Sequence, residues 1–367
     1  MLLIEEIIKE AYKRGASDIH LVSGMKPIIR VKRNLQQIND KPLLKVEDLW
    51  EIYDYIIQGN VDMDDFFKEN RKLDTSLEWN NIRLRVNASY AGDKPIFTMR
   101  IIPTDLPKFD ELGLPEIIRT MLYQPQGLFL ITGKTNSGKS TTLNAMINEI
   151  NEKQNKKILT LENPIEFKHN SKKSFIVQKE VGIRKDVENF RDGVKNALRE
   201  DCDILVIGEI RDRETMEAAI DMVESGHLVI GTLHTKSCAE TIDRMISFYE
   251  VKEQTQIKNL LSGLLKIVVS QRLLRHKDGE NLVLAQEIMM VDNIVSACIR
   301  KEKFNVSEIE DAIQSSSAIG SISITSTLAK LYLEDKITID LAKSQTDPRN
   351  IETLNRTISQ LSKIMEV

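Results

Sequence analysis

Residues Gly127–Thr142 read GLFLITGKTNSGKSTT, and this stretch decides the fold of the chain. It opens with Leu128–Thr132, a run of apolar and β-branched residues that predicts a buried strand. Gly133–Ser140 follows and matches G-x-x-x-x-G-K-[ST], the pattern of a phosphate-binding loop. Apolar residues then recur at helical spacing, at Leu143, Ile147 and Ile150. The order strand, loop, helix is the context that this motif requires, so the stretch predicts a phosphate site in an α/β domain.

The residue types in the loop suit a nucleotide and Mg²⁺. Gly133 and Gly138 allow a close backbone approach, so that backbone N–H groups can converge on phosphate oxygens. Lys139 is predicted to place its charge on the β- and γ-phosphates, and the Ser140 hydroxyl to ligate Mg²⁺. The alternative, a plain glycine turn, does not account for the agreement between motif and flanks. The predicted ATP-binding residues are Gly133, Lys134, Thr135, Asn136, Ser137, Gly138, Lys139, Ser140 and Thr141.

Composition narrows the class of protein. The chain has 367 residues, enough for two or three domains, with 41% hydrophobic and 29% charged residues as in ordinary globular proteins. Its net charge of −4 provides no global positive field, so we expect no nucleic-acid partner. The three cysteines form no C-x-x-C pair, which suggests neither a disulfide framework nor a zinc site. The acidic N-terminus is not typical of a signal peptide, and no apolar run is long enough for a transmembrane helix. We therefore expect a cytoplasmic protein that reaches a membrane only through partners.

The first part of the chain is predicted to form a small α+β domain, residues 1–102. Apolar residues at helical spacing predict helices over Leu3–Ala11 and Val46–Ile57. Short apolar or alternating runs predict strands, at residues 19–22, 28–31, 82–86 and 96–102. Three prolines between Pro103 and Pro115 predict a linker over residues 103–115.

From residue 116 to 290 strands are predicted to alternate with helices, which indicates a parallel sheet. Three of these strands end in polar residues, Glu162, Glu209 and His234. Ligands bind at the carboxyl ends of strands in open α/β sheets, so all three could face one nucleotide. Beyond about Ile242 we predict mostly helix with a hairpin about Asp278-Gly279, and residues 291–367 are predicted as a helical C-terminal region.

The strand ends supply candidates for catalysis. Glu209 could order Mg²⁺, largely through water, and Glu162 could accept the proton of an attacking water. The alternative for Glu162 is a solvated carboxylate at a strand end. His227 and His234 bracket a strand, and seven residues along a strand separate them too widely for a metal pair. They could bond to the site or a neighbouring subunit, or be satisfied structural histidines.

Four segments in this order resemble the boxes of the type II/IV secretion ATPase superfamily. They are GKTNSGKST, ILTLENPIEF, REDCDILVIGEIRD and GHLVIGTLHT, which resemble the Walker A, aspartate, Walker B and histidine boxes. The N-terminal GASDIHLVSGMKPIIRV is similar to the pilus-retraction members of that superfamily. The resemblance implies a homohexameric ring of PAS-like N-terminal domains and RecA-like motor domains. It also implies that Glu162 is the catalytic glutamate and Glu209 the Walker B glutamate, and that Arg85 and Arg100 reach the γ-phosphate of a neighbouring subunit.

The function implied by this resemblance is an ATP-hydrolysing motor that powers type IV pilus retraction and twitching motility. Such a motor would bind an inner-membrane platform protein and lie at the inner face of the cytoplasmic membrane. Two alternatives stay open: a pilus assembly or type II secretion ATPase, and a nucleotide-binding regulatory ring without turnover. Asn163 and Lys179 stand where the superfamily usually has aspartate and arginine, Lys134 stands where proline is usual, and IVSACIRK at 294–301 matches a retraction signature weakly.

The tail also carries a pattern. Apolar residues recur at intervals of three and four, at Ile351, Leu354, Ile358, Leu361 and Met365. They predict a helix with one narrow apolar stripe, which must pack against something because such a helix is marginal alone in water. The stripe could pack on the motor domain of the same subunit, or contact a neighbouring subunit or the membrane platform.

Overall fold

A computed structural model describes residues 2–32, 34–80, 82–102, 106–182 and 185–365. Residues 103–105 of the predicted linker, the last two residues of the tail and the side chains of Ile364 and Met365 lie outside this description. The chain forms two compact units. Unit 1 contains Met1–Leu106 and Pro164–Lys168, and unit 2 contains Pro107–Asn163 and His169–Val367. Residues 107–115, predicted as part of a linker, lie in unit 2, where Phe109 and Leu114 are buried. The domain boundaries predicted from the sequence stay a prediction.

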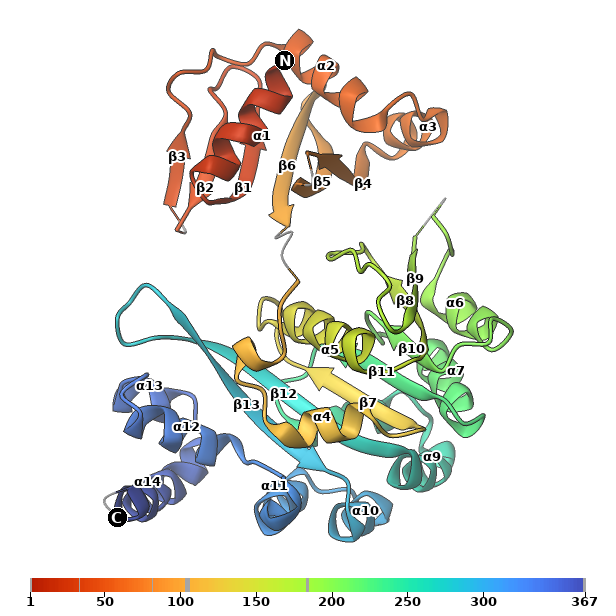
Figure 1. The fold of residues 1–367 in the computed structure, drawn as a ribbon, viewed down its shortest axis with the longest axis vertical. Coiled ribbons are helices and arrows are strands. Elements are labelled where there is room, and N and C mark those ends of the chain that lie inside the picture. Colours follow the sequence, from red (N-terminus) through yellow and green to blue (C-terminus); the bar gives the residue numbers. More distant parts are fainter. Residues whose placement is uncertain (1, 33, 81, 103–105, 183–184, 366–367) are drawn as a thin grey trace. The chain divides into compact units, whose positions relative to one another are not determined.

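Unit 1 is an antiparallel sheet with helices packed on it (Figure 1). Its helices are α1 (Leu3–Lys13), α2 (Val46–Ile57) and α3 (Val61–Asn70). Its strands are β1 (Ala16–Leu21), β2 (Ile28–Val31), β3 (Asn34–Gln37), β4 (Lys72–Trp79), β5 (Ile82–Ala91) and β6 (Lys94–Ile102), in the order β3-β2-β1-β6-β5-β4. The predicted α+β composition is confirmed, although β3, β4 and α3 were not predicted. Alternation in β5 buries Ile82, Leu84 and Val86 on one face, as its sequence predicts.

Unit 2 is built on a mixed sheet in the order β13-β12-β7-β11-β10-β8-β9. Its strands are β7 (Gly127–Thr132), β8 (Lys157–Glu162), β9 (Phe175–Glu180), β10 (Ile204–Ile207), β11 (Leu228–Leu233), β12 (Leu265–Arg275) and β13 (Leu282–Met290). Every pairing is parallel except that of β12 with β13. The predicted parallel core and the hairpin are therefore confirmed. The prediction of mostly helix after Ile242 is wrong for residues 265–290, where an apolar run adds two long strands to the sheet.

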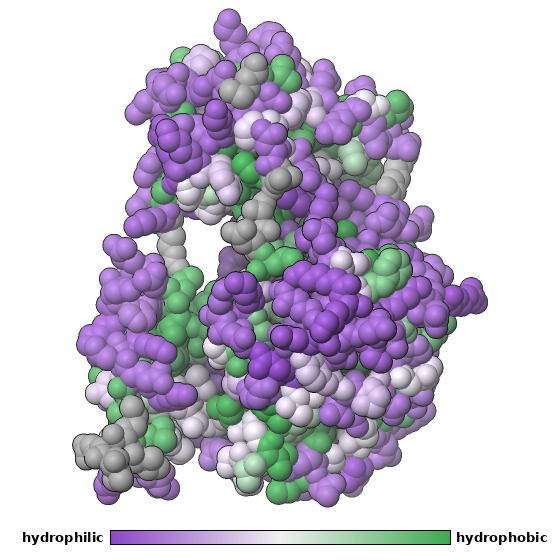
Figure 2. Space-filling model, viewed as in Figure 1, coloured by the Kyte–Doolittle hydropathy of each residue, from purple (hydrophilic) through white to green (hydrophobic). Residues whose placement is uncertain are grey.

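Helices cover both faces of this sheet. One face packs on α4 (Glu116–Leu122) and α5 (Lys139–Lys153). The other face packs on helices that follow β9 in the chain, namely α6 (Phe190–Ala197), α7 (Arg213–Glu224), α8 (Cys238–Ser247) and α9 (Val251–Leu264). The face of the molecule drawn in Figure 2 is mainly hydrophilic, with apolar residues in smaller patches. Because the central strands are covered on both sides, their sequences are continuous apolar runs rather than alternating ones.

The remaining helices follow the sheet at the C-terminal end of unit 2. They are α10 (Asn293–Arg300), α11 (Val306–Ser315), α12 (Ile324–Leu333), α13 (Ile339–Ser344) and α14 (Ile351–Met365). The apolar stripe of α14 packs in a cluster with α12 and the β12–β13 hairpin through Leu354, Ile358 and Leu361. Leu354 is fully buried, which is worth about 1.5–3 kcal/mol of stabilisation. Packing of the stripe on its own subunit, the first of the two alternatives, is therefore what the structure shows. Among the described residues, no helix is long and apolar enough to cross a membrane.

Candidate nucleotide-binding site

The phosphate loop connects β7 to α5, as the sequence predicts. All six residues of β7 are buried, so the strand holds the start of the loop rigidly in the sheet. Gly133 has φ 149° and Gly138 has φ 87°, backbone conformations that favour glycine. A Cβ atom on Gly133 would lie 2.5 Å from the carbonyl oxygen of Gln271 and 2.4 Å from Ser137 Oγ. The loop therefore closes on β12 in a way that only glycine permits at this position.

Lys139 folds back over the loop from the first position of α5. Its ammonium group donates to the carbonyl oxygens of Gly133 at 2.7 Å and of Lys134 at 3.0 Å. The side chain is almost fully buried, so a positive charge is fixed at the concave side of the loop. The buried Ser137 hydroxyl has no hydrogen-bond partner among the described residues. A fixed charge, an unpartnered buried hydroxyl and a cradle that a Cβ would fill all suit a bound phosphate.

Two of the predicted strand-end residues meet this lysine. His234 follows β11, and its Nδ1 lies 3.3 Å from Lys139 Nζ. The Nε2 atom of the same ring lies 3.2 Å from Oε1 of Glu209, which follows β10. Because β7, β11 and β10 are neighbours in the sheet, their carboxyl ends bring these three side chains into one continuous polar contact. Arg211 pairs with Glu209 from the solvent side.

The second histidine lies elsewhere. His227 precedes β11, and its Nδ1 contacts Ser225 Oγ at 2.9 Å and the carbonyl oxygen of Met222 at 3.0 Å. It therefore lies at the opposite end of β11 from His234. Of the two histidines, for which contact with the site, contact with a neighbouring subunit and a structural role were left open, this chain brings only His234 to the loop. The reason is the length of the strand, since residues seven positions apart along a strand are about 23 Å apart. Contact of His227 with a neighbouring subunit stays a prediction.

Glu162 ends β8, three strand positions from β7 in the sheet. Adjacent strands are about 4.8 Å apart, so about 14 Å of sheet separates the two strand ends. Glu162 is buried, and its Oε1 accepts hydrogen bonds from Thr160 Oγ1 at 2.7 Å and Gln178 Nε2 at 3.0 Å. It is therefore not the solvated carboxylate of the alternative interpretation.

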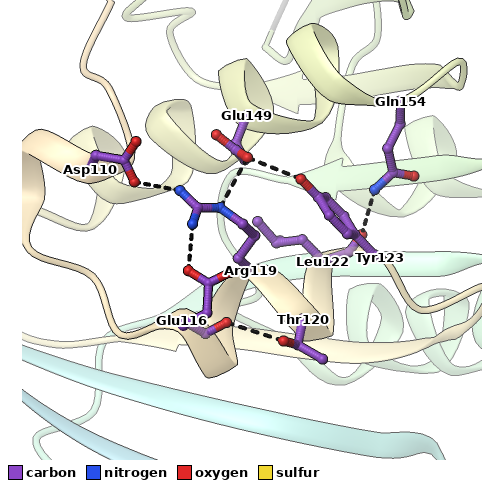
Figure 3. Close-up of polar contacts among 8 residues, drawn as sticks. All are labelled: Asp110, Glu116, Arg119, Thr120, Leu122, Tyr123, Glu149 and Gln154. Carbon is purple, nitrogen blue, oxygen red and sulfur yellow. Dashed lines mark hydrogen bonds and ion pairs between the residues drawn. The ribbon is translucent and has the colours of Figure 1, made fainter.

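The helix that follows the phosphate loop is fastened to α4 (Figure 3). Arg119 on α4 donates from Nε to Glu149 Oε1 on α5 at 3.0 Å and also pairs with Asp110 and Glu116. Tyr123 donates to the same Glu149 oxygen at 3.0 Å, and burial together with this carboxylate raises the pKa of Tyr123 to about 12. Glu149 is buried and would be an uncompensated charge without Arg119. The cluster thus holds α5, and with it the phosphate loop, against α4 and the segment that precedes α4 in the chain.

A cavity of about 630 Å³ opens beside the loop on the side of β12. The outer loop residues line it together with the start of α8, the hairpin and the C-terminal helices. Its lining includes Ser137, Gln271, Arg272 and Glu287, and burial raises the pKa of the Glu287 carboxyl. The side chain of Gln271 donates to Thr142 of α5 at 2.8 Å. Sequence patterns did not single out Gln271, because this contact joins residues far apart in the chain.

The two candidate arginines lie on neighbouring strands of unit 1. Arg85 on β5 and Arg100 on β6 are directly opposite each other in the antiparallel register, so both side chains leave the same face of the sheet. Both are exposed, and Arg100 Nε donates to Oδ1 of the buried Asp18 at 3.1 Å. Unit 1 therefore presents a pair of cationic side chains on one surface.

The chain belongs to a known family of ATPases. The profile of the family described as "Type II/IV secretion system protein" matches residues 1–329, so the expected membership in this superfamily is confirmed. The chain is 38% identical to the "Type IV pilus retractation ATPase PilT" of Pseudomonas aeruginosa, over 93% of this chain and 97% of that protein. It is 37% identical to the "Twitching motility protein" of Neisseria gonorrhoeae, over 90% of this chain and 86% of that protein.

A solved structure agrees with these relatives. The crystal structure of the pilus retraction motor PilT with bound ADP superposes with a TM-score of 0.88 at 36% identity, covering 96% of this chain and 100% of that one. The predicted resemblance to the pilus-retraction ATPases is thereby confirmed, as are the α/β ATPase fold and nucleotide binding at the level of the family.

Proposed function

We propose that this protein is an ATP-hydrolysing motor that powers type IV pilus retraction, the activity named for its relatives. The observation that carries the proposal is the continuous contact from Lys139 through His234 to Glu209, which joins the phosphate loop to two neighbouring strand ends. A loop that only bound a nucleotide would need its backbone N–H groups and Lys139, with no link to other strand ends. A lysine linked through a histidine to an acidic strand end suits a site that also positions a metal ion for transfer of the phosphoryl group.

Each side chain has a separate task in this proposal. When bound, ATP would supply the phosphoryl group that water attacks, and Mg²⁺ would neutralise charge on its oxygens. Lys139 would place its charge on the β- and γ-phosphates, and the Ser140 hydroxyl would bind the metal. Glu209, held by His234, would order the water ligands of the metal, and Glu162 would accept the proton of the attacking water. No group of three or more His, Cys, Asp or Glu side chains that could hold a metal is found within the described part of the chain. The metal would therefore take few protein ligands and several oxygens from water and phosphate.

The finer organisation is also part of the proposal. We infer a homohexameric ring, with unit 1 as the PAS-like domain and unit 2 as the RecA-like motor. The ring would lie in the cytoplasm on the inner face of the cytoplasmic membrane and bind an inner-membrane platform protein. Arg85 and Arg100 would reach the γ-phosphate held by the neighbouring subunit. Their paired exposure on one face of unit 1 supports this role, since cations that only stabilised their own sheet would not need to be presented together.

Action of these arginines in trans can be tested by mixing subunits. Arg100→Ala and Lys139→Ala proteins are each expected to lack ATPase activity, and their mixture is expected to recover part of it. The physical reason is that one interface of a mixed ring can combine an intact loop with an intact arginine. Recovery should vary with the mixing ratio, and Arg71→Ala, which changes another exposed arginine of unit 1, serves as the control. Full activity of either single variant, or no recovery in any mixture, would contradict the proposal.

Two measurements test the function as a whole. A steady-state ATPase assay on the purified protein separates a motor from a regulatory ring without turnover.

Deletion of the gene separates the directions of action, because cells without a retraction motor are expected to be hyperpiliated and immobile, whereas cells without an assembly motor are expected to lack pili. Complementation with the Lys139→Ala variant should leave the deletion phenotype unchanged. Cells that lack pili after the deletion would favour the assembly or secretion alternative.

A further inference from the structure

A chain of polar contacts joins the start of α5 to Glu162. Asn144 lies one turn after Ser140 on α5 and is almost completely buried. Its Nδ2 donates to the carbonyl oxygen of Ser140 at 2.9 Å, and its Oδ1 lies 2.7 Å from Nε2 of His169. His169 is also buried and belongs to the segment between β8 and β9. The first link therefore ties this segment to α5, the helix that carries Ser140.

The second link runs from residue 169 to the carboxylate. The backbone N–H of His169 donates to Oε1 of Gln178 at 2.8 Å, and Gln178 Nε2 donates to Glu162 Oε1 at 3.0 Å. A backbone N–H can only donate, so it fixes which end of the Gln178 amide faces it. The remaining end must then be the N–H₂ group, which is the end that a carboxylate accepts from. The direction of every hydrogen bond in this link is thus determined.

The imidazole of His169 fits the same order. The Nε2–H tautomer donates to Asn144 Oδ1 and leaves Nδ1 as a bare acceptor, whereas a proton on Nδ1 would be buried without a partner among the described residues. Burial, with a smaller contribution from the nearby Lys172 charge, lowers the pKa of His169 to about 4. The ring is therefore neutral near pH 7 and acts as a fixed hydrogen-bond donor rather than as a charge.

We propose that Asn144, His169 and Gln178 are positioning residues that hold the Glu162 carboxylate in a fixed position relative to α5, the helix that follows the phosphate loop. The inference rests on the catalytic role proposed above for Glu162. Its physical basis is distance. Glu162 ends β8, three strand positions from β7, so the sheet fixes the backbone of residue 162 but leaves its side chain free to change rotamer relative to the phosphate loop. Effective proton transfer needs placement within about 1 Å, and errors of that size cost about 100-fold in rate. A chain of buried hydrogen bonds provides this placement.

The test replaces the polar links and measures binding and turnover separately. Gln178→Leu keeps most of the side-chain volume and removes the amide, and we expect kcat for ATP to fall about 10- to 100-fold while KM and ADP affinity change by less than threefold. His169→Phe should lower kcat by a similar factor. His169→Gln carries an amide that can donate to the same oxygen of Asn144, so its kcat should be at least a third of the wild-type value. The matched control is Gln154→Leu, which removes a side-chain hydrogen bond at the far end of α5 and should change kcat less than twofold.

A second comparison separates this inference from the role of Glu162. In a Glu162→Gln background, Gln178→Leu should lower the single-turnover rate by less than a further twofold, because its effect passes through the carboxylate. If Glu162→Gln itself leaves turnover intact, the catalytic role and the inference both fail. If Glu162→Gln removes turnover but Gln178→Leu and His169→Phe leave kcat within twofold of wild type, the positioning inference is overturned and the role of Glu162 stands. Multiplied losses in the double variant, or a loss of ADP affinity equal to the loss in kcat, would also overturn it.

Discussion

The Lys139→Ala variant is expected to lose steady-state ATP hydrolysis, by a factor of at least about 10²–10³. The lysine ammonium is buried, bonds to two carbonyl oxygens of the loop and touches His234. Alanine removes a fixed charge from the place where negative charge is proposed to develop on the transferring phosphoryl group. It also removes the contact that connects the loop to His234 and Glu209. Nucleotide binding is expected to weaken and yet to persist, because the backbone N–H groups of the loop remain.

Phosphate release and ADP binding should therefore be measured on the same preparation. A rise in melting temperature on addition of ADP would show that the variant is folded and still binds nucleotide. Lys153→Ala is the matched control, since this lysine lies exposed at the last turn of the same helix and should leave turnover unchanged. Turnover of Lys139→Ala near the wild-type rate would remove the phosphate loop from the mechanism.

Local sequence was enough to predict the phosphate loop, because its determinants are contiguous. A buried strand, two glycines and a helix start lie within sixteen residues, and each acts on its neighbours. The same holds for the strand ends Glu162, Glu209 and His234, which follow short apolar runs. Parallel pairing then places these ends on one edge of the sheet, a consequence of topology that the alternation of strands and helices already implies.

The contacts that hold the site in place could not be predicted in this way. Gln178 lies on β9, an edge strand of mixed polarity that the pattern did not reveal, and its partner His169 lies in an irregular segment. Arg119 and Glu149 are thirty residues apart and meet only because α4 and α5 cover the same face of the sheet. Hydrogen bonds of this kind depend on tertiary structure, and no periodicity of one segment encodes them.

His227 shows where the sequence pattern stopped. The pattern placed the two histidines too far apart for a metal pair but left open whether either of them bonds to the site. A six-residue strand separates its ends so widely that only one end can face the nucleotide. The strand direction decides which one, since ligands lie at the carboxyl edge of such a sheet. His234, at the carboxyl end, meets Lys139, whereas His227 bonds within the turn before the strand.

Glu162→Gln is expected to keep nucleotide affinity and to lose turnover by about 10²–10⁴-fold. The substitution preserves the shape of the side chain and one carbonyl-type oxygen, which can still accept from Thr160 and Gln178. What it removes is the carboxylate, the group proposed to take a proton from the attacking water. The prediction is specific to proton acceptance, because a residue that only bound the nucleotide would change affinity and rate together.

The measurement is the rate per bound nucleotide, obtained from a single-turnover experiment at saturating protein, with ADP affinity determined in parallel. Glu166→Gln serves as the matched control, since it makes the same change to a half-buried glutamate four residues further along the chain. Its rate per bound nucleotide should stay within about twofold of wild type. If Glu162→Gln lowers affinity while the rate per bound nucleotide stays the same, Glu162 binds the nucleotide or its metal and another group takes the proton. Glu162→Gln is also expected to leave the melting temperature unchanged. The neutral glutamine introduces no buried charge, and its oxygen can keep the hydrogen bonds that hold position 162 at the end of β8.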